Sequence, residues 1–163
     1  GLGALTVKAL AAEADVPPSS MLYTMPSHAV ARDRALEAIA PAIHQRISGL
    51  PAEPPAEGPE RARMLLEALL ALGAERRLEA SVLQVLSASA LTEPGLQPIW
   101  REVDGTIRDV CAQALRAQSV RGDLVALDHL HTVMAGLTAQ LMNRGEGRSS
   151  RWADAVLERE LAR

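Results

Sequence analysis

Near the start of the chain, a short stretch holds hydroxyl and aromatic side chains that could hydrogen-bond to DNA. It reads as two short helices, at about 6–14 and 18–24, joined by a tight turn. In a helix-turn-helix protein this arrangement places the second helix in the major groove. Because of their place on or beside these helices, we take as candidate DNA contacts Thr6, Pro18, Ser19, Ser20, Tyr23, Thr24 and His28.

The residue types in this stretch suit their expected positions. Thr6 can cap the first helix, and Pro18 suits the first turn of the second, where a backbone N–H would have no helical partner anyway. Base reading would fall to Ser19, Ser20 and Thr24. Their side chains are short, so each would make a single contact with a base edge rather than a bidentate one.

The charge of the same stretch limits how strongly it could hold phosphates. Residues 1–34 carry three positive and three negative side chains, namely Lys8, Arg32 and Arg34 against Glu13, Asp15 and Asp33. The whole chain has a net charge of −3. Non-specific DNA affinity scales with the number of neutralised phosphates. We therefore expect weak binding by this part unless basic residues precede Gly1.

Other residues with chemical potential lie further along the chain. His129 and His131 are two positions apart, so they point to different sides of a helix, and no metal site is expected. They read instead as surface or dimer-face histidines. Cys111 lies on an apolar stripe and reads as an inert core thiol rather than a redox sensor. Asp104 and Arg108 are spaced as a helix-surface ion pair, although one of them could instead enter a ligand pocket.

The sequence contains no pattern that supports catalysis. It has no glycine-rich phosphate loop, no Ser–His–Asp arrangement and no carboxylate pair in a known frame. We therefore predict neither an enzyme nor a cofactor.

Composition points to an all-α protein. Hydrophobic residues make up 48% of the 163 positions, but aromatic residues only 2%, and Phe is absent. A core of Leu, Ala, Val, Ile and Met suits helices better than strands. The single cysteine excludes an internal disulfide, and there is neither a membrane-spanning run nor a signal-peptide pattern. We expect a cytoplasmic protein with no membrane partner.

The rest of the chain divides into helices at recognisable breaks. Ser27 should cap a helix over about 28–48, with a kink or break near Ile39–Pro41, since proline removes a backbone hydrogen bond. The proline-rich stretch 49–59, "GLPAEPPAEGP", is the best domain boundary. Beyond it, apolar spacing predicts helices at about 60–73, 75–90, 96–118, 125–143 and 150–162.

One segment resembles a known family. Residues 5–39 read "LTVKALAAEADVPPSSMLYTMPSHAVARDRALEAI" and resemble the helix-turn-helix segment of the TetR family of bacterial transcriptional regulators. The later stretches "QALRAQSVRGDL" and "ALDHLHTVMAGLTAQLM" stand where late helices of that family's second domain stand. The match covers nearly the whole chain, but its specific part is residues 5–31.

The resemblance implies an all-α homodimer with two domains per subunit. Residues 1–48 would form a partial helix-turn-helix DNA-binding domain with its connecting helix, and residues 49–163 an effector-binding and dimerisation domain. The protein would be a transcriptional regulator, most simply a repressor, that binds double-stranded operator DNA. A small-molecule effector would move the connecting helix at about 28–48 and release the DNA.

The resemblance also implies a pocket and a dimer face. The pocket would lie between the helices at about 60–73, 75–90, 96–118 and 125–143, lined by Met64, Leu83, Trp100, Val103, Asp104, Ile107 and Met134. With so few aromatic residues, its aliphatic and Met-rich wall would suit a lipophilic effector over a flat stacked one. The last two helices would dimerise through Leu127, Leu130, Met134, Leu137, Trp152 and Val156.

The departures from the family pattern all fall on the DNA side. Asp15 stands where the family usually has Gly, Pro17 replaces the usual Ser or Thr cap, Leu22 replaces Tyr, and His28 replaces Lys. The family's first helix and basic arm have no counterpart before Gly1, so we expect the sequence to begin partway into its gene product. These departures favour an alternative function, a dimeric ligand-binding or protein-interaction module that has lost DNA binding.

Overall fold

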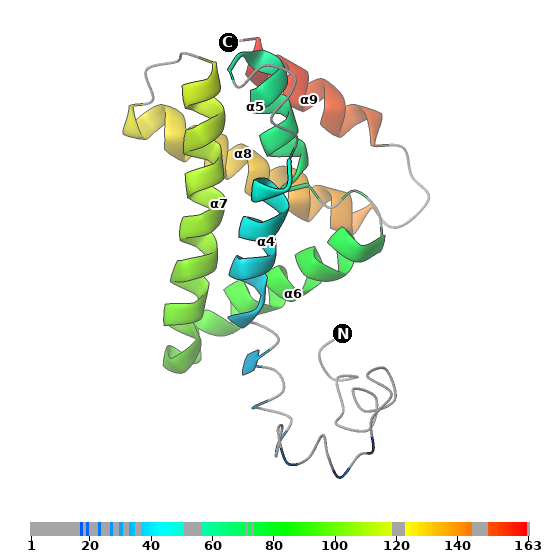
Figure 1. The fold of residues 1–163 in the computed structure, drawn as a ribbon, viewed down its shortest axis with the longest axis vertical. Helices are drawn as coiled ribbons and strands as arrows, with labels where there is room; N and C mark the ends of the chain where they lie inside the picture. The colour runs from blue at the N-terminus through cyan, green and yellow to red at the C-terminus, as the bar shows by residue number, and fades with distance from the viewer. Residues whose placement is uncertain are drawn as a thin grey trace.

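The structure is a computed structural model that describes residues 37–50, 57–70, 72, 74–118, 123–144 and 150–162, and before these the separate positions 17, 19, 23, 27, 30, 33 and 34. Every regular element in these ranges is a helix, which confirms the all-α class (Figure 1). The elements are α4 (Ile39–Ser48), α5 (Pro59–Glu67), α6 (Ala74–Ala90), η2 (Pro94–Leu96), α7 (Gln97–Ala117), α8 (Leu124–Asn143) and α9 (Arg151–Leu161). None of these helices is both long and apolar enough to cross a membrane.

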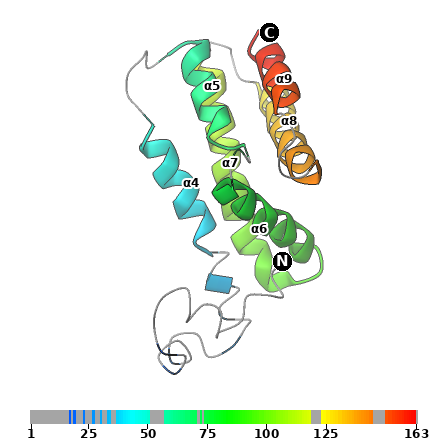
Figure 2. The same ribbon diagram turned by 90° about the vertical axis from the view of Figure 1, so that its right-hand side faces the viewer.

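Helix α7 is the central element of the described part. Its 21 residues give it a length of about 31 Å, and it contacts α4, α5, α6 and α8. Figure 2 shows α4 on one side of α7, with α8 and α9 on the other. The two halves of α7 belong to two different hydrophobic clusters.

The first half of α7 packs with α4 and α6, and the second half with α5, α8 and α9. Val103 belongs to the first cluster, together with Ile39, Ala40, Ile43, Leu86, Ala90 and Leu96. Val110 and Cys111 belong to the second, whose members on other helices include Leu66, Met134 and Leu157. Leu69 packs against both clusters. The junction between the two clusters is therefore marked by this one side chain.

The helix starts follow from their residue types. Gly58 precedes α5 with φ 104°, a conformation that L side chains rarely adopt, and Pro59 begins the helix. The backbone N–H of Gly58 donates to the carbonyl of Ala117 at 2.6 Å, so the start of α5 is tied to the end of α7. Asp123 caps α8, since its Oδ1 accepts from the N–H of Ala126 at 2.7 Å.

Helix α4 begins where the proline predicts a break. Ala38 is a turn residue, and α4 starts at Ile39, so Pro41 lies in the first turn and needs no helical donor. Ser27 accepts the N–H of Val30 on its hydroxyl at 3.2 Å, as the predicted cap requires.

The expected end of the helix at 60–73 is wrong, because α5 ends at Glu67. The Glu67 carbonyl accepts from the N–H of Leu70 at 3.1 Å and from Arg76 Nη1 at 3.0 Å, which closes the helix in a turn. The turn buries Leu70 completely and half-buries Leu69. The apolar spacing therefore continues beyond the last residue of the helix, which is why the sequence predicts a helix that is too long.

The predicted division after residue 48 stays a prediction, because most of residues 1–36 lie outside the described residues. Helix α4, from the predicted first domain, packs on α7 and shares a cluster with α6.

Candidate functional site

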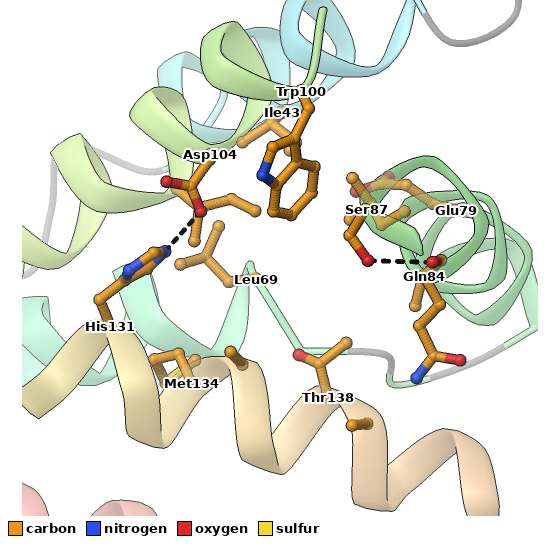
Figure 3. A pocket seen from close by; sticks show the side chains of 15 residues that line it. Ile43, Leu69, Glu79, Gln84, Ser87, Trp100, Asp104, His131, Met134 and Thr138 are labelled. Atoms are coloured by element: carbon orange, nitrogen blue, oxygen red, sulfur yellow. Dashed lines mark hydrogen bonds and ion pairs between the residues drawn. The ribbon is translucent and has the colours of Figure 1, made fainter. Parts of the chain in front are cut away.

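A cavity of about 240 Å³ lies between α4, α6, α7 and α8, close to the junction of the two clusters (Figure 3). Sites for drug-sized ligands run from about 300 to 1,000 Å³, so this cavity suits a smaller molecule. Helix α4 contributes Ile43, and the turn after α5 contributes Leu69. The other lining residues are Glu79, Ala80, Leu83, Gln84, Ser87, Trp100, Asp104, Ile107, His131, Met134, Ala135, Thr138 and Ala139.

Helical spacing brings these side chains to one space. Trp100, Asp104 and Ile107 stand at i, i+4 and i+7 on α7, and therefore share one face. On α6 the lining positions are 79, 80, 83, 84 and 87, and on α8 they are 131, 134, 135, 138 and 139. Both sets repeat at three- and four-residue intervals. Each of the three helices thus presents a single stripe to the cavity.

Asp104 and His131 form the polar pair of this cavity. The Oδ1 atom of Asp104 lies 3.2 Å from Nε2 of His131, and the two side chains are 37% and 19% exposed. The predicted surface pair of Asp104 with Arg108 is wrong. Arg108 Nη1 instead lies 2.6 Å from Oδ1 of Asp128. Both α7 residues therefore pair across to α8, because that helix offers a partner to each.

Glu79 connects the cavity wall to α4. Its Oε2 accepts from Nη1 of Arg46 and its Oε1 from Nη2, both at 2.8 Å. The two side chains are only 24% and 21% exposed. A bidentate arginine–carboxylate pair of this kind fixes orientation as well as charge. The wall that α6 provides is thereby tied to α4.

Ser87 is not placed as a nucleophile for the Asp104–His131 pair. Its hydroxyl donates to the carbonyl of Gln84 at 2.9 Å, within its own helix. Figure 3 shows Ser87 across the cavity from His131. The residues around the cavity can bind a ligand through the carboxylate of Asp104, the imidazole of His131, neutral polar groups and apolar walls, whereas the second carboxylate, of Glu79, is bonded to Arg46.

The structure brings five of the seven predicted pocket residues to this cavity, namely Leu83, Trp100, Asp104, Ile107 and Met134. Met64 is not among the lining residues, since α5 packs against α7 and α9 and only the following turn reaches the cavity. Val103 is not among the lining residues either, although it follows Trp100 by three positions, because its side chain is buried in the cluster with Ile39, Ala40 and Ile43 of α4. That these residues bind an effector remains a prediction.

Several lining residues were missed, although a signal for some of them was present. Leu83 and Met134 were predicted, and their helical neighbours at three or four positions include Glu79, Ser87, His131 and Thr138. Extending each stripe by one turn would have found these four. No local pattern points to Ile43, because α4 reaches the cavity only through tertiary packing.

Three of the predicted dimer residues need a correction. Leu130, Met134 and Leu137 are buried in the core of a single chain, in a cluster that also contains residues of α5, α7 and α9. Their side chains are only 1–6% exposed, which leaves little of them for contact with a second copy. Leu127 and Trp152 are partly buried against the same core, and Trp152 lies under the guanidinium of Arg144, whose Cζ is 4.0 Å from the ring centroid. Val156 is 36% exposed. Dimerisation itself remains a prediction.

Most of the predicted DNA contacts lie outside the described residues, namely Thr6, Pro18, Ser20, Thr24 and His28. Ser19 and Tyr23 are described; both are helical and exposed, and Tyr23 is 91% exposed.

The two histidines of α8 point to opposite sides, as their spacing predicts. His131 faces Asp104 on α7, whereas Nε2 of His129 lies 2.8 Å from Oε2 of Glu160 on α9. The latter pair lines a second cavity of about 150 Å³ between α7, α8 and α9. In the described part of the chain no three His, Cys, Asp or Glu side chains gather as a metal ion would need.

Cys111 is a core thiol, as its apolar stripe predicts. It is completely buried in the second cluster. Burial raises the pKa of the thiol to about 12. At neutral pH the reactive thiolate is therefore not formed.

Comparison with known proteins adds no family to this picture. No protein-family model matches the chain, and no curated protein is significantly similar to it in sequence.

Proposed function

We propose that this chain is a TetR-like transcriptional regulator, most simply a repressor, that binds operator DNA as a homodimer and releases it when a small lipophilic effector binds. The sequence of residues 5–31 supports the DNA-binding part of this proposal. The cavity between α4, α6, α7 and α8 supports the effector part. Catalysis is not proposed, because no nucleophile lies beside the Asp104–His131 pair among the residues that line this cavity.

One observation carries the proposal: the cavity wall includes the helix that leads back to the DNA-reading segment. Ile43 of α4 lines the cavity, and Arg46 of α4 holds Glu79 of the opposing wall through two bonds of 2.8 Å. A ligand that displaces either wall therefore acts on α4 directly. A coupling of this kind needs a difference in ligand affinity between two positions of α4.

Fluorescence anisotropy with labelled DNA tests the proposal. The protein would carry every residue that its gene encodes, and the DNA would come from just upstream of that gene. We expect selective binding over random DNA of equal length, with log affinity falling linearly with log salt concentration. Equal affinity for the two DNAs at every salt concentration would contradict the proposal.

A variant at the exposed Tyr23 separates specific contact from bulk charge. The change Tyr23→Phe removes only the hydroxyl, and Tyr23→Ala also removes the ring. If Tyr23 contacts a phosphate, Tyr23→Phe should weaken binding to both DNAs alike and leave selectivity unchanged. An unaltered affinity in both variants would remove Tyr23 from the interface.

The second candidate function is a dimeric ligand-binding or protein-interaction module without DNA binding. The balanced charge of residues 1–34, together with Asp15, Leu22 and His28, favours it. The same titration decides between the two functions. Ligand binding without selective DNA binding would support the module.

A further inference from the structure

The charges around the cavity are of one sign. Among the described residues, its lining includes the carboxylates of Glu79 and Asp104 and no Lys or Arg. Within that described lining, His131 is the one side chain that can carry positive charge. A ligand anion would thus meet two carboxylates, whereas a ligand cation would meet complementary charge.

The two carboxylates differ in how far they are already neutralised. Both oxygens of Glu79 are bonded to the guanidinium of Arg46, so its charge is compensated. Asp104 contacts His131 through one oxygen, Oδ1, at 3.2 Å, and its side chain is 37% exposed. A neutral imidazole leaves the carboxylate charge in place. Arg108, one turn along α7, is directed to Asp128 instead, at 2.6 Å.

An aromatic ring lies on the same side of the cavity as this carboxylate. Trp100 precedes Asp104 by one helical turn, and Figure 3 shows the indole and the carboxylate on the same side of the cavity. A cation near both groups gains from the carboxylate charge and from the ring face, for which Trp is the best partner. The remaining walls are largely apolar, with Leu69, Leu83 and Met134 among them.

We infer that the cavity binds a lipophilic monocation, with an ammonium group at Asp104 and Trp100 and an aliphatic body against Leu83, Ile107 and Met134. This names the effector class for the site of the proposed function, on which it rests. A small aliphatic amine fits the volume of about 240 Å³. The neutral polar groups of Gln84 and Thr138 can donate to a carbonyl oxygen, or exchange a hydrogen bond with a hydroxyl, at the other end of the ligand.

The test compares three probes that share one alkyl chain: octylamine, octanol and octanoate. Binding is measured by titration calorimetry near pH 8, where an alkylammonium is charged. We expect octylamine to bind at least about tenfold more tightly than octanol, and octanoate most weakly. Equal affinities, a preference for octanoate, or no octylamine binding up to about 1 mM would overturn the inference.

Variants on α7 locate the preference. Asp104→Asn keeps the shape and removes the charge, so octylamine affinity should fall about tenfold while octanol affinity stays unchanged. Asp104→Glu should retain the preference. Asp109→Asn makes the same charge change at an exposed position of the same helix, outside the cavity lining, and should leave all three affinities unchanged. Equal losses in Asp104→Asn and Asp109→Asn would overturn the assignment to Asp104.

These titrations contain no DNA, so they test the cation site independently of the DNA binding that the proposed function requires. A preference for octylamine without selective operator binding would contradict the proposed regulator and support the cation site. Selective operator binding without a preference for octylamine would support the proposed regulator and contradict the cation site.

Discussion

Arg46 of α4 and Glu79 of α6 hold each other through two hydrogen bonds of 2.8 Å, and Glu79 also lines the cavity. The two residues are 33 positions apart in the sequence. Since both side chains are mostly buried, the pair forms a bidentate, partly desolvated link between α4 and the cavity wall.

Breaking this pair should destabilise the fold. Glu79→Gln removes the negative charge that the mostly buried guanidinium of Arg46 holds through two hydrogen bonds, and we expect the free energy of unfolding to fall by about 1–3 kcal/mol. Urea denaturation followed by circular dichroism measures the change. Arg101→Gln is the control, because the exposed Arg101 side chain bonds the neutral side chain of Gln97, and its effect should stay within about 0.5 kcal/mol. Equal effects of the two variants would show that the pair is energetically unimportant.

The same chemical change at two glycines should have opposite effects. Gly58 has φ 104°, so Gly58→Ala forces a strained backbone and should reduce stability by about 1–3 kcal/mol, although the space for a Cβ is open. Gly105 lies within α7, and its Cβ would also meet nothing within 4 Å. Gly105→Ala should therefore increase stability by about 0.5–1 kcal/mol. Thermal melts of both variants check the signs, and a stabilising Gly58→Ala would refute the strain argument.

Cys111 should make stability fall at alkaline pH. Burial raises the pKa of its thiol from an ordinary 9.0 to about 12. Between these values the unfolded chain loses the proton while the folded chain keeps it, so the unfolded state binds fewer protons and stability declines as pH rises. The decline attributable to Cys111 should not exceed about 1.4 kcal/mol per pH unit.

Urea titrations of the wild type and of Cys111→Ala between pH 8 and pH 11 isolate this effect, because all other groups titrate in both proteins. The stability difference between the two proteins should shrink as pH rises. A difference that is constant with pH would contradict a buried neutral thiol. At neutral pH, a thiol reagent should modify Cys111 only after urea is added.

Helix positions were largely readable from the sequence, because apolar spacing and helix breakers are local signals. The helices expected at 96–118 and 125–143 are α7 (Gln97–Ala117) and α8 (Leu124–Asn143). The error at the end of α5 has a physical cause: a buried turn also needs apolar residues, so Leu69 and Leu70 extend the pattern beyond the last helical bond.

The cavity was only partly readable. The stripe on α7 follows from helical spacing, so Trp100, Asp104 and Ile107 could be named together. The ion-pair partner of each charged residue, by contrast, depends on tertiary packing. The local rule favoured Arg108 for Asp104, but α8 brings His131 to within 3.2 Å. For the same reason nothing in the sequence joined Arg46 to Glu79.

The two tryptophans should report separately on the cavity. Trp100 lines it, whereas Trp152 lies on α9 beside Arg144, outside the lining. In Trp152→Phe, where only Trp100 emits, saturation with the tighter-binding of octylamine and octanol should shift or quench the fluorescence, because the ligand replaces water beside the indole. In Trp100→Phe, the same titration should leave the emission of Trp152 unchanged. A response from Trp152 alone would place the ligand elsewhere, and responses from both would indicate a rearrangement that reaches α9.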